Sequence, residues 1–262
     1  MANRATLSGV FPYKDDNPTV LAPIVTIGII VLNVLAWLFL QGAGASEPLG
    51  ASVCQLGLIP GELLGTVPPG TRVPLGPGMA CVIEGPHYAT VLTSMFMHGG
   101  WLHIIGNMWF LWVFGNNIED SMGHARFLVF YLVCGVAAAA AQVLVDTHAR
   151  VPMVGASGAI SGVLGAYVVL YPRVRVHTLI TLGFFFTTVA LPAYFMLGYW
   201  FVLQLLLGAV GIAGRVQGGV AVWAHVGGFL AGLALIKLFV NPALMAQHVS
   251  PDSGEWWRRQ PG

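Results

Sequence analysis

Long apolar runs, separated by short polar stretches, follow one another along most of the chain. A helix that crosses a bilayer needs about 20 mostly apolar residues. The pattern predicts an all-α polytopic membrane protein built as a bundle of six transmembrane helices. The predicted spans are 21–40, 103–114, 126–145, 155–171, 193–210 and 220–240.

One further apolar stretch, 176–190, is too short for an easy crossing and is followed by Pro192. A seventh crossing at this point would also reverse the direction of the last span. We therefore expect this stretch to be an interfacial or re-entrant segment that leads into the fifth span. The segment 88–97 is expected to lead into the second span.

The spans divide the chain into a short N-terminal tail (1–20), a transmembrane domain (21–240) and a C-terminal tail (241–262). A long loop rich in Gly and Pro, at about 41–87, interrupts the domain. The first apolar run has an alternative interpretation as a signal peptide, because the QGAGAS that follows it resembles a cleavage site. A signal-peptide core has about 7–15 apolar residues. This run is longer and acidic residues precede it, which favours a retained span.

The distribution of basic residues predicts the orientation, because cytoplasmic loops carry an excess of Lys and Arg. With the N-terminus in the cytoplasm, most basic residues fall on the cytoplasmic side. These are Arg4, Lys14, Arg126, Arg173, Arg175, Lys237, Arg258 and Arg259, against Arg72, Arg150 and Arg215 outside. We expect a multi-pass protein of the cell membrane with both termini cytoplasmic. Trp256 and Trp257 are expected to form an interfacial anchor in the C-terminal tail.

Composition agrees with a membrane location and limits the partners. Hydrophobic residues make up 56% of the chain and charged residues 8%, whereas soluble domains carry roughly 25% charged residues. The net charge of +1 gives no reason to expect a nucleic-acid partner. The sequence has no CxxC and no His/Cys cluster, so we expect no metal and no cofactor. Cys54 and Cys81 both lie in the 41–87 loop, where a disulfide in an oxidising compartment and two free thiols are the alternatives.

Four polar residues fall at a similar depth within three predicted spans. His103 and Asn107 are four residues apart near the outer end of the second span, so they share one helix face. Ser157 lies at the outer end of the fourth span, and His225 lies inside the outer end of the sixth. Ionisable residues within a membrane are functional-site candidates by default. Each residue alone also suits helix packing or hydrogen bonding between helices, but the shared depth favours one common site.

These residue types suit hydrolysis of an amide by a serine nucleophile. A serine hydroxyl needs a base within hydrogen-bond reach, and His225 is the candidate base for Ser157. The oxyanion that forms during attack needs preorganised donors, for which His103, Asn107 and the backbone N–H of the serine are candidates. Glu119 lies at the cytoplasmic end of its span and is expected to be structural. The predicted catalytic set is therefore a Ser–His dyad.

Glycines follow both catalytic candidates at helical spacing. Gly158 and Gly162 form a GxxxG pair after the serine, and Gly228 and Gly232 follow the histidine. Small faces let two helix backbones approach closely, which a hydrogen bond between side chains on different helices requires. Gly155 is expected to keep the approach to the serine hydroxyl open.

Together these motifs resemble those of the rhomboid family of intramembrane serine proteases. GASGAISG contains the family's GxSG with Ser157, and AHVGGFLAG contains its AHxxGxxxG with His225. HGGWLHIIGN contains its HxxxxHxxxN with His103 and Asn107, and GNNIEDSMG contains its GxxxExxxG with Glu119. The resemblance extends over nearly the whole chain, from KDDNP to HVGGFLAGL.

This resemblance implies a six-helix rhomboid bundle around a water-filled cavity that is open to the outside. It implies cleavage of single-pass transmembrane substrates near their outer ends, at sites with small residues. The span 193–210 would act as a lateral gate and the loop 211–219 as a cap. Some members have an aromatic residue that packs on the catalytic histidine where this chain has Ser161. Tyr199 and Trp200 are the candidates to replace that aromatic.

Two alternative functions are compatible with a polytopic membrane protein. Rhomboid-like binders without protease activity lose the serine or the histidine, and this chain has both. A transporter is expected to have broken helices and charges near the bilayer midplane, whereas the polar residues here are neutral and displaced outward. The sequence therefore predicts an intramembrane serine endopeptidase whose partners are transmembrane substrates and the lipid bilayer.

Overall fold

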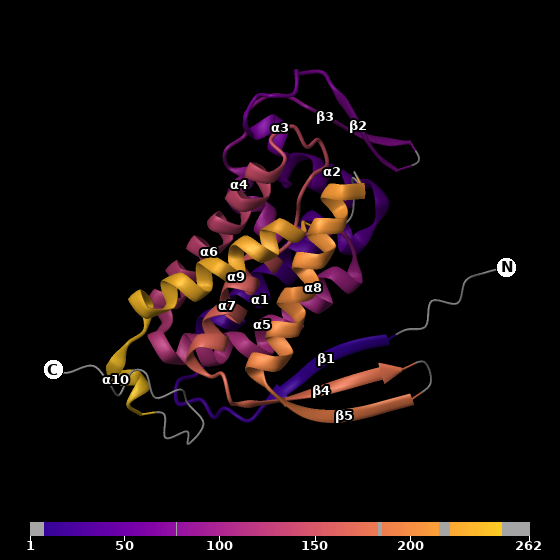
Figure 1. Ribbon diagram of the computed structural model, residues 1–262. Coiled ribbons are helices and arrows are strands. Elements are labelled where there is room, and N and C mark those ends of the chain that lie inside the picture. The colour runs from indigo at the N-terminus through magenta and orange to yellow at the C-terminus, as the bar shows by residue number, and fades with distance from the viewer. Residues whose placement is uncertain (1–7, 77, 183–184, 215–220, 248–262) are drawn as a thin grey trace.

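The computed structural model describes residues 8–76, 78–182, 185–214 and 221–247 of the chain. Within these residues, six helices of 12 residues or more form the body of the molecule (Figure 1). They are α1 (Ile24–Leu35), α5 (Trp101–Met122), α6 (His124–Val145), α7 (Ser157–Leu170), α8 (Ala193–Gly214) and α9 (Val222–Phe239). Each overlaps one of the six apolar segments of the sequence. A π-helical turn, Ala36–Leu40, extends α1.

Three helices of the described chain are long and apolar enough to cross a membrane, by length and composition. They are His124–Val145, Ala193–Gly211 and Val222–Phe239. The segments Ile24–Leu40 and Ser157–Leu170 are apolar but shorter. The protein is therefore mostly helical with several candidate spans, and the count of six crossings stays a prediction.

Two small sheets accompany the helices, so the fold is mostly helical rather than purely α. Strands β1 (Ser8–Asp15), β4 (Arg175–Leu182) and β5 (Phe185–Pro192) form an antiparallel sheet in the order β1-β4-β5. Strands β2 (Arg72–Gly76) and β3 (Met79–Val82) form a second, two-stranded sheet.

The stretch 176–190, expected to be interfacial or re-entrant, forms most of the β4–β5 hairpin, and its place relative to the membrane stays a prediction. Its sequence is rich in Val, Thr, Ile and Phe, the residue types that favour strands. Val176 and Thr178 are buried, two positions apart, on one face of β4. Part of the predicted N-terminal tail is the third strand of the same sheet. Hydropathy and length do not distinguish such a hairpin from a short apolar segment beside the membrane.

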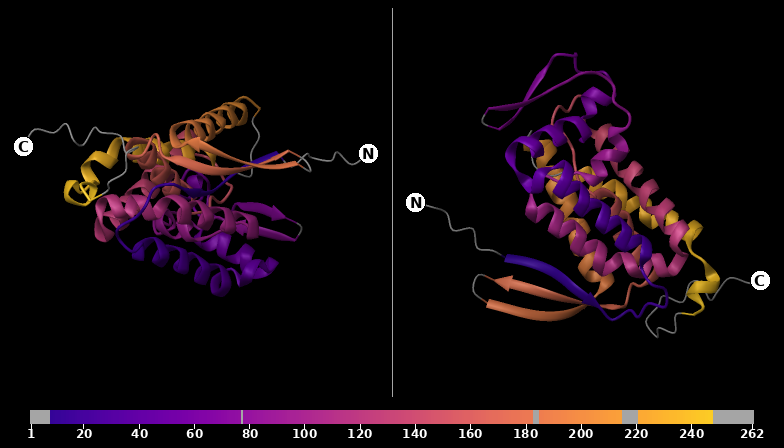
Figure 2. Two further views of the ribbon diagram at one scale, coloured as in Figure 1. Left: turned by 90° about the horizontal axis from the view of Figure 1, so that it is seen from below. Right: turned by 180° about the vertical axis from the view of Figure 1, so that it is seen from behind.

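The two sheets lie at opposite ends of the helix bundle (Figures 1 and 2). The β1–β4–β5 sheet shares its end with the short helix α10 (Pro242–Met245), and we call this the sheet end. The long loop after α1 occupies the other end, with α2 (Ser46–Leu56), α3 (Pro60–Leu63) and the β2–β3 hairpin; we call this the loop end. The helix α4 (Thr90–Thr93) and a 3-10 turn, Ser94–Phe96, connect this loop to α5.

A disulfide joins Cys54 of α2 to Cys81 of β3. The two residues are 27 positions apart in the sequence, and a cross-link over such a loop stabilises a fold by about 3–4 kcal/mol through the unfolded chain's lost entropy. The loop is also tied to the bundle, because Leu58 and Met153 form an antiparallel β-bridge. The segment just before α7 is thereby held from outside the helices.

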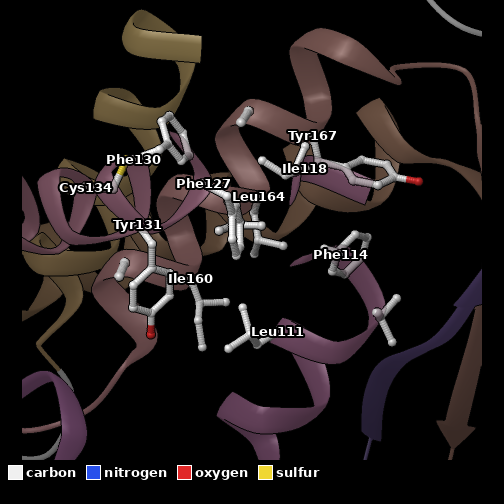
Figure 3. Close-up of a cluster of buried hydrophobic side chains, with 14 of the residues drawn as sticks. Leu111, Phe114, Ile118, Phe127, Phe130, Tyr131, Cys134, Ile160, Leu164 and Tyr167 are labelled. Atoms are coloured by element: carbon white, nitrogen blue, oxygen red, sulfur yellow. The ribbon is translucent and has the colours of Figure 1, made fainter. Parts of the chain in front are cut away.

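The hydrophobic core lies where α5, α6 and α7 meet (Figure 3). Phe114 of α5 contacts Tyr167 of α7 edge to face, with ring centroids 5.0 Å apart. Phe127 and Phe130 of α6 are fully buried in the same cluster. Large side chains thus fill this side of α7, whereas small residues line its contact with α9.

Two carboxylates of α5 bind the N-terminal end of α1. Glu119 accepts hydrogen bonds from the backbone N–H groups of Val25 and Thr26, each at 2.8 Å, and its Oε1 lies 2.6 Å from Nδ1 of His124. Asp120 accepts hydrogen bonds from the backbone N–H groups of Val20 and Leu21, just before the helix, at 2.7 Å each. Since a helix N-terminus has free donors and a positive dipole, these carboxylates fix α1 to α5 at the sheet end.

Asp15, at the end of β1, is a third carboxylate at this end of the bundle. Its Oδ2 accepts hydrogen bonds from the Tyr167 hydroxyl at 2.5 Å and from Nδ2 of Asn117 at 2.7 Å. Burial raises the pKa of Asp15 to about 6, with a smaller contribution from the charge of Asp16. The folded protein therefore binds a proton here more tightly than the unfolded chain does.

We expect Asp15→Asn to remove a pH dependence of stability. Because the folded pKa lies above the usual 3.8, the contribution of Asp15 to stability is greatest below that value and falls as pH rises to about 6. The melting temperature of the Asn variant in detergent should therefore increase relative to that of the natural protein between about pH 4 and pH 6.5. A difference between the two proteins that stays constant over this range would contradict the expectation.

Several sequence-based predictions fall outside the described residues. They concern most of the cap at 211–219 and the C-terminal anchor with Trp256 and Trp257. Four of the basic residues used to predict the orientation also lie outside the described residues: Arg4, Arg215, Arg258 and Arg259.

Candidate active site

Ser157 and His225 lie side by side at the loop end of the bundle. The serine is the first residue of α7, and the histidine is in the first turn of α9. The serine Oγ lies 2.7 Å from Nε2 of the histidine, which is a short hydrogen bond. Both side chains are half-buried, so the pair is accessible from one side. A hydroxyl that donates to an imidazole nitrogen is the arrangement that activates a serine nucleophile.

Close backbone packing of α7 on α9 brings this pair together. A Cβ added to Gly228 would lie 2.0 Å from the carbonyl oxygen of Gly158, and one added to Gly232 would lie 1.9 Å from that of Gly162. A Cβ on Gly165 would lie 2.2 Å from the carbonyl oxygen of residue 229. The two backbones therefore touch over two turns, and no larger residue fits between them. The glycines predicted from the sequence to allow close approach are the residues at this contact.

Gly155 shapes the backbone just ahead of the serine. Its φ of +128° is a conformation that favours glycine, and a Cβ here would lie 2.7 Å from Nε2 of His103 and 3.5 Å from Nδ2 of Asn107. Its N–H donates to the carbonyl oxygen of Ser94 at 2.9 Å. The glycine thus lets the two side chains of α5 approach the chain beside Ser157.

The side chains of His103 and Asn107 provide hydrogen-bond donors beside the serine. Nδ1 of His103 accepts from the N–H of Gly99 at 3.2 Å, so in the neutral ring the proton is on Nε2. Nδ2 of Asn107 is buried and has no hydrogen-bond partner among the described residues. The backbone N–H of Ser157 is at a helix N-terminus, where the first N–H groups have no intrahelical acceptor. A buried donor without a partner is unusual, and here it lies beside Gly155, two residues before the serine.

Two side chains of α8 contact the imidazole of His225. Oε1 of Gln204 lies 3.0 Å from Nδ1, and the ring centroid of Trp200 lies 5.9 Å from that of the histidine. Of the two aromatic candidates, Trp200 makes this contact, and Tyr199 is 49% exposed. Sequence reasoning missed Gln204, although it is the only polar side chain between Trp200 and Gly214 of α8. The hydroxyl of Ser161 donates to the carbonyl oxygen of Ser157 at 2.6 Å.

The surroundings of the pair contain two further features. His98 is fully buried and its ring packs edge to face on that of His103, with centroids 5.1 Å apart. A small cavity of about 20 Å³ opens beside Ser157. Its lining includes Gly135, Ala138, Ala139, Gly158, Ala159 and Ala224.

The predicted site residues thus fall into two groups. The structure brings the serine, the two histidines and the asparagine to the loop end, together with the glycines of the α7–α9 contact. Glu119 lies at the sheet end and the disulfide lies in the long loop, both away from the serine. No group of three or more His, Cys, Asp or Glu residues suited to a metal ion occurs in the described part of the chain.

Comparison with known proteins gives the family. The rhomboid domain matches residues 86–242, which include α5 to α9 and all four polar residues of the site. The chain belongs to the rhomboid family. The motifs suggested a resemblance over nearly the whole chain, but the matched part of this rhomboid is shorter. It leaves out α1 and most of the 41–87 loop.

Individual relatives are distant. This rhomboid is 32% identical over 154 residues to RHOMBOID-like protein 5 of Arabidopsis thaliana, which covers 59% of this chain and 44% of the relative. It is 30% identical over 165 residues to the rhomboid protease GluP of Bacillus subtilis, over 63% of this chain and 29% of the relative. Rhomboid protein 1 of yeast mitochondria is 29% identical over 176 residues, over 64% and 47% of the two chains. The aligned region is thus less than two thirds of each relative.

Proposed function

We propose that this rhomboid is an intramembrane serine endopeptidase that cleaves single-pass transmembrane proteins near the outer membrane face. The observation that carries the proposal is the 2.7 Å contact between the Ser157 hydroxyl and His225, beside the donors of His103 and Asn107. Membership of a family that includes a protease supports the same conclusion. A binding protein without activity has no need for a serine and a histidine held at this distance.

In the proposed reaction, Oγ of Ser157 attacks the carbonyl carbon of the scissile peptide bond while Nε2 of His225 takes the hydroxyl proton. The carbonyl oxygen becomes an oxyanion that accepts hydrogen bonds from Asn107, His103 and the serine N–H. The histidine then gives the proton to the leaving amine as the C–N bond breaks. Water then attacks the acyl carbon while Nε2 of His225 takes a proton from it, and the histidine gives this proton to Oγ of Ser157 as the ester bond breaks.

The length of α7 supports a site below the membrane surface. Its 14 residues span about 21 Å, whereas the hydrocarbon core is about 30 Å thick. If the sheet end of α7 reaches one boundary, Ser157 lies about 10 Å inside the other. A transmembrane substrate must therefore unwind locally to present a peptide bond, which favours substrates with weak helices near their outer ends.

The cavity beside the serine supports a preference for small side chains at the cleavage site. Its lining is formed largely by Gly and Ala, and its volume is about 20 Å³. A methyl group suits such a space better than a branched or aromatic side chain, because overpacking is destabilising.

The proposed topology has six crossings, with the sheet end in the cytoplasm and the loop end outside. Both described ends of the chain, β1 and α10, lie at the sheet end, as an even number of crossings requires. The excess of Lys and Arg at this end supports a cytoplasmic location. A disulfide at the loop end supports an oxidising compartment outside. We propose the cell membrane as the location on the same grounds.

The proposal is tested with purified protein in proteoliposomes and a single-pass substrate that has Ala and Gly in its outer segment. We expect cleavage within that segment, mapped by mass spectrometry, and covalent labelling of Ser157 by a fluorophosphonate. A substrate whose outer segment is poly-Leu serves as the control and should stay intact. Absence of both cleavage and labelling in folded protein would refute the proposal, and labelling at Ser161 would reassign the nucleophile.

A further inference from the structure

Gln204 lies in a position that the proposed dyad does not explain. Its Oε1 is 3.0 Å from Nδ1 of His225, on the side of the ring opposite Ser157. Within the described part of the chain, no carboxylate forms a hydrogen bond or ion pair with this histidine. A glutamine in an apolar helix therefore occupies the place where soluble serine proteases have an aspartate.

The bond determines which imidazole nitrogen carries the proton. A glutamine Oε1 accepts hydrogen bonds and does not donate them, so this orientation of the Gln204 amide selects the ring with its proton on Nδ1 of His225. In the neutral ring the lone pair is then on Nε2, the atom 2.7 Å from the hydroxyl of Ser157. In the other tautomer Nε2 carries a proton and cannot accept one from the serine. Gln204 thus selects the form of the ring that works as a base.

The same contact fixes the orientation of the ring. Trp200 is four residues before Gln204, so both side chains project from one face of α8. The Trp200 ring packs at 5.9 Å from that of His225. The histidine is therefore held by a hydrogen bond at Nδ1 and by a tilted contact with the Trp200 ring, both from α8.

Helix α8 is held less tightly than the helices that carry the dyad. Its sheet end is buried at Ala193, Met196 and Leu197, whereas Leu206 and Val210 near the loop end are 57% and 64% exposed. Its contact with α9 is made by side chains, such as the stack of Phe201 on Phe229 with centroids 4.5 Å apart. The α7–α9 contact is instead made by touching backbones. A displacement of α8 can therefore withdraw Gln204 while Ser157 and His225 stay together.

We propose that Gln204 is a positioning residue that holds His225 as its Nδ1–H tautomer and makes the reactivity of Ser157 depend on the placement of α8. This inference rests on the proposed protease function. The step it assists balances without a further reactant, since the serine proton moves to Nε2 as the O–C bond forms. The Nδ1 proton stays in its bond to Gln204 throughout.

The first experiment compares Gln204→Leu with Gln204→Glu, which keeps an acceptor at the same place. We expect the Leu variant to lower kcat about 10- to 100-fold with KM changed less than about twofold, because orientation and not substrate binding is lost. The Glu variant should restore kcat to within about threefold of the natural protein. Gln142→Leu is the control, since Oε1 of Gln142 accepts from the backbone N–H of Ala224, beside the histidine, without touching its ring.

A second measurement reads the tautomer without relying on activity. ¹⁵N NMR of histidine-labelled protein, with His225 assigned by difference from His225→Ala, should show the Nδ1–H form in the natural protein and a larger Nε2–H population in Gln204→Leu. If the natural protein cleaves substrate and the Leu variant keeps both kcat and tautomer, the inference is overturned. If the natural protein neither cleaves nor labels, the proposed function fails, whereas the tautomer result still decides the role of Gln204.

The dependence on α8 is tested by loosening its contact with α9 at a distance from the imidazole. Phe201→Ala removes the stack on Phe229, and Val202→Ala, at a position 51% exposed, is the matched control on the same helix. We expect Phe201→Ala to slow fluorophosphonate labelling of Ser157 at least about fivefold, and Val202→Ala to leave it unchanged. Equal labelling rates in the two variants would overturn the dependence on α8.

Discussion

We expect Ser157→Ala to lower the rate of substrate cleavage by about 10⁴- to 10⁶-fold, as removal of the nucleophile does in other serine proteases. The substitution removes one oxygen atom, whose hydrogen bond in the protein is to Nε2 of His225 at 2.7 Å. The helix N-terminus and the donors of Asn107 and His103 stay in place. The melting temperature should therefore change little, while turnover and fluorophosphonate labelling are both lost. Single-turnover cleavage in proteoliposomes measures the effect.

Ser161→Ala is the matched control for this experiment. It makes the same chemical change one turn further along α7, where the hydroxyl donates to the backbone carbonyl of Ser157 at 2.6 Å and is 1% exposed. We expect it to change cleavage less than about tenfold, since no reacting atom is touched. If Ser157→Ala retained activity while Ser161→Ala lost it, the proposed nucleophile would be wrong.

His225→Ala extends the test from the nucleophile to the pair. Because the serine and the histidine act as one unit, the double variant should be about as inactive as either single variant. A double variant much less active than both would show that the two residues contribute separately, which contradicts a dyad.

The sequence predicts the helices and the four polar residues of the site for a simple reason. Long apolar runs determine the helices, and helix rise then gives the depth of each polar residue within them. Ser157 and His225 are each in the first turn of a helix that begins at the loop end. Equal depth on neighbouring helices is sufficient to suggest their contact, and glycine spacing identifies the faces that meet.

Other features depend on interactions that hydropathy does not measure. The β4–β5 hairpin is stabilised by pairing with β1, which is about 160 residues earlier in the chain. Gln204 lies on α8, which runs from the sheet end to the loop end, so its depth must be counted from the opposite terminus. The choice between Tyr199 and Trp200 depends on the rotation of α8, which is set by packing on α9 rather than by sequence periodicity.

We expect Gly228→Ala to abolish most activity by separating the two helices that carry the dyad. The new Cβ would lie 2.0 Å from the carbonyl oxygen of Gly158, whereas carbon and oxygen atoms in contact need more than about 3 Å. Neither atom is at the end of a flexible side chain, so the backbones of α7 and α9 must move apart by about 1 Å or more. The 2.7 Å hydrogen bond between Ser157 and His225 would then exceed the hydrogen-bond range.

The expected consequence is a loss of cleavage of about 100-fold or more, since a misplacement of about 1 Å has that effect on a catalytic group. Overpacking should also lower stability by about 1–3 kcal/mol, measured as the melting temperature in detergent. Gly28→Ala in α1 is the control, because a Cβ there would meet no atom of the described residues within 4 Å and alanine favours a helix by up to about 1 kcal/mol. If backbone contact between α7 and α9 holds the site together, Gly228→Ala should lower the melting temperature and Gly28→Ala should raise it. Activity should be lost only in Gly228→Ala. A Gly228→Ala protein that keeps full activity would show that the dyad does not depend on this contact.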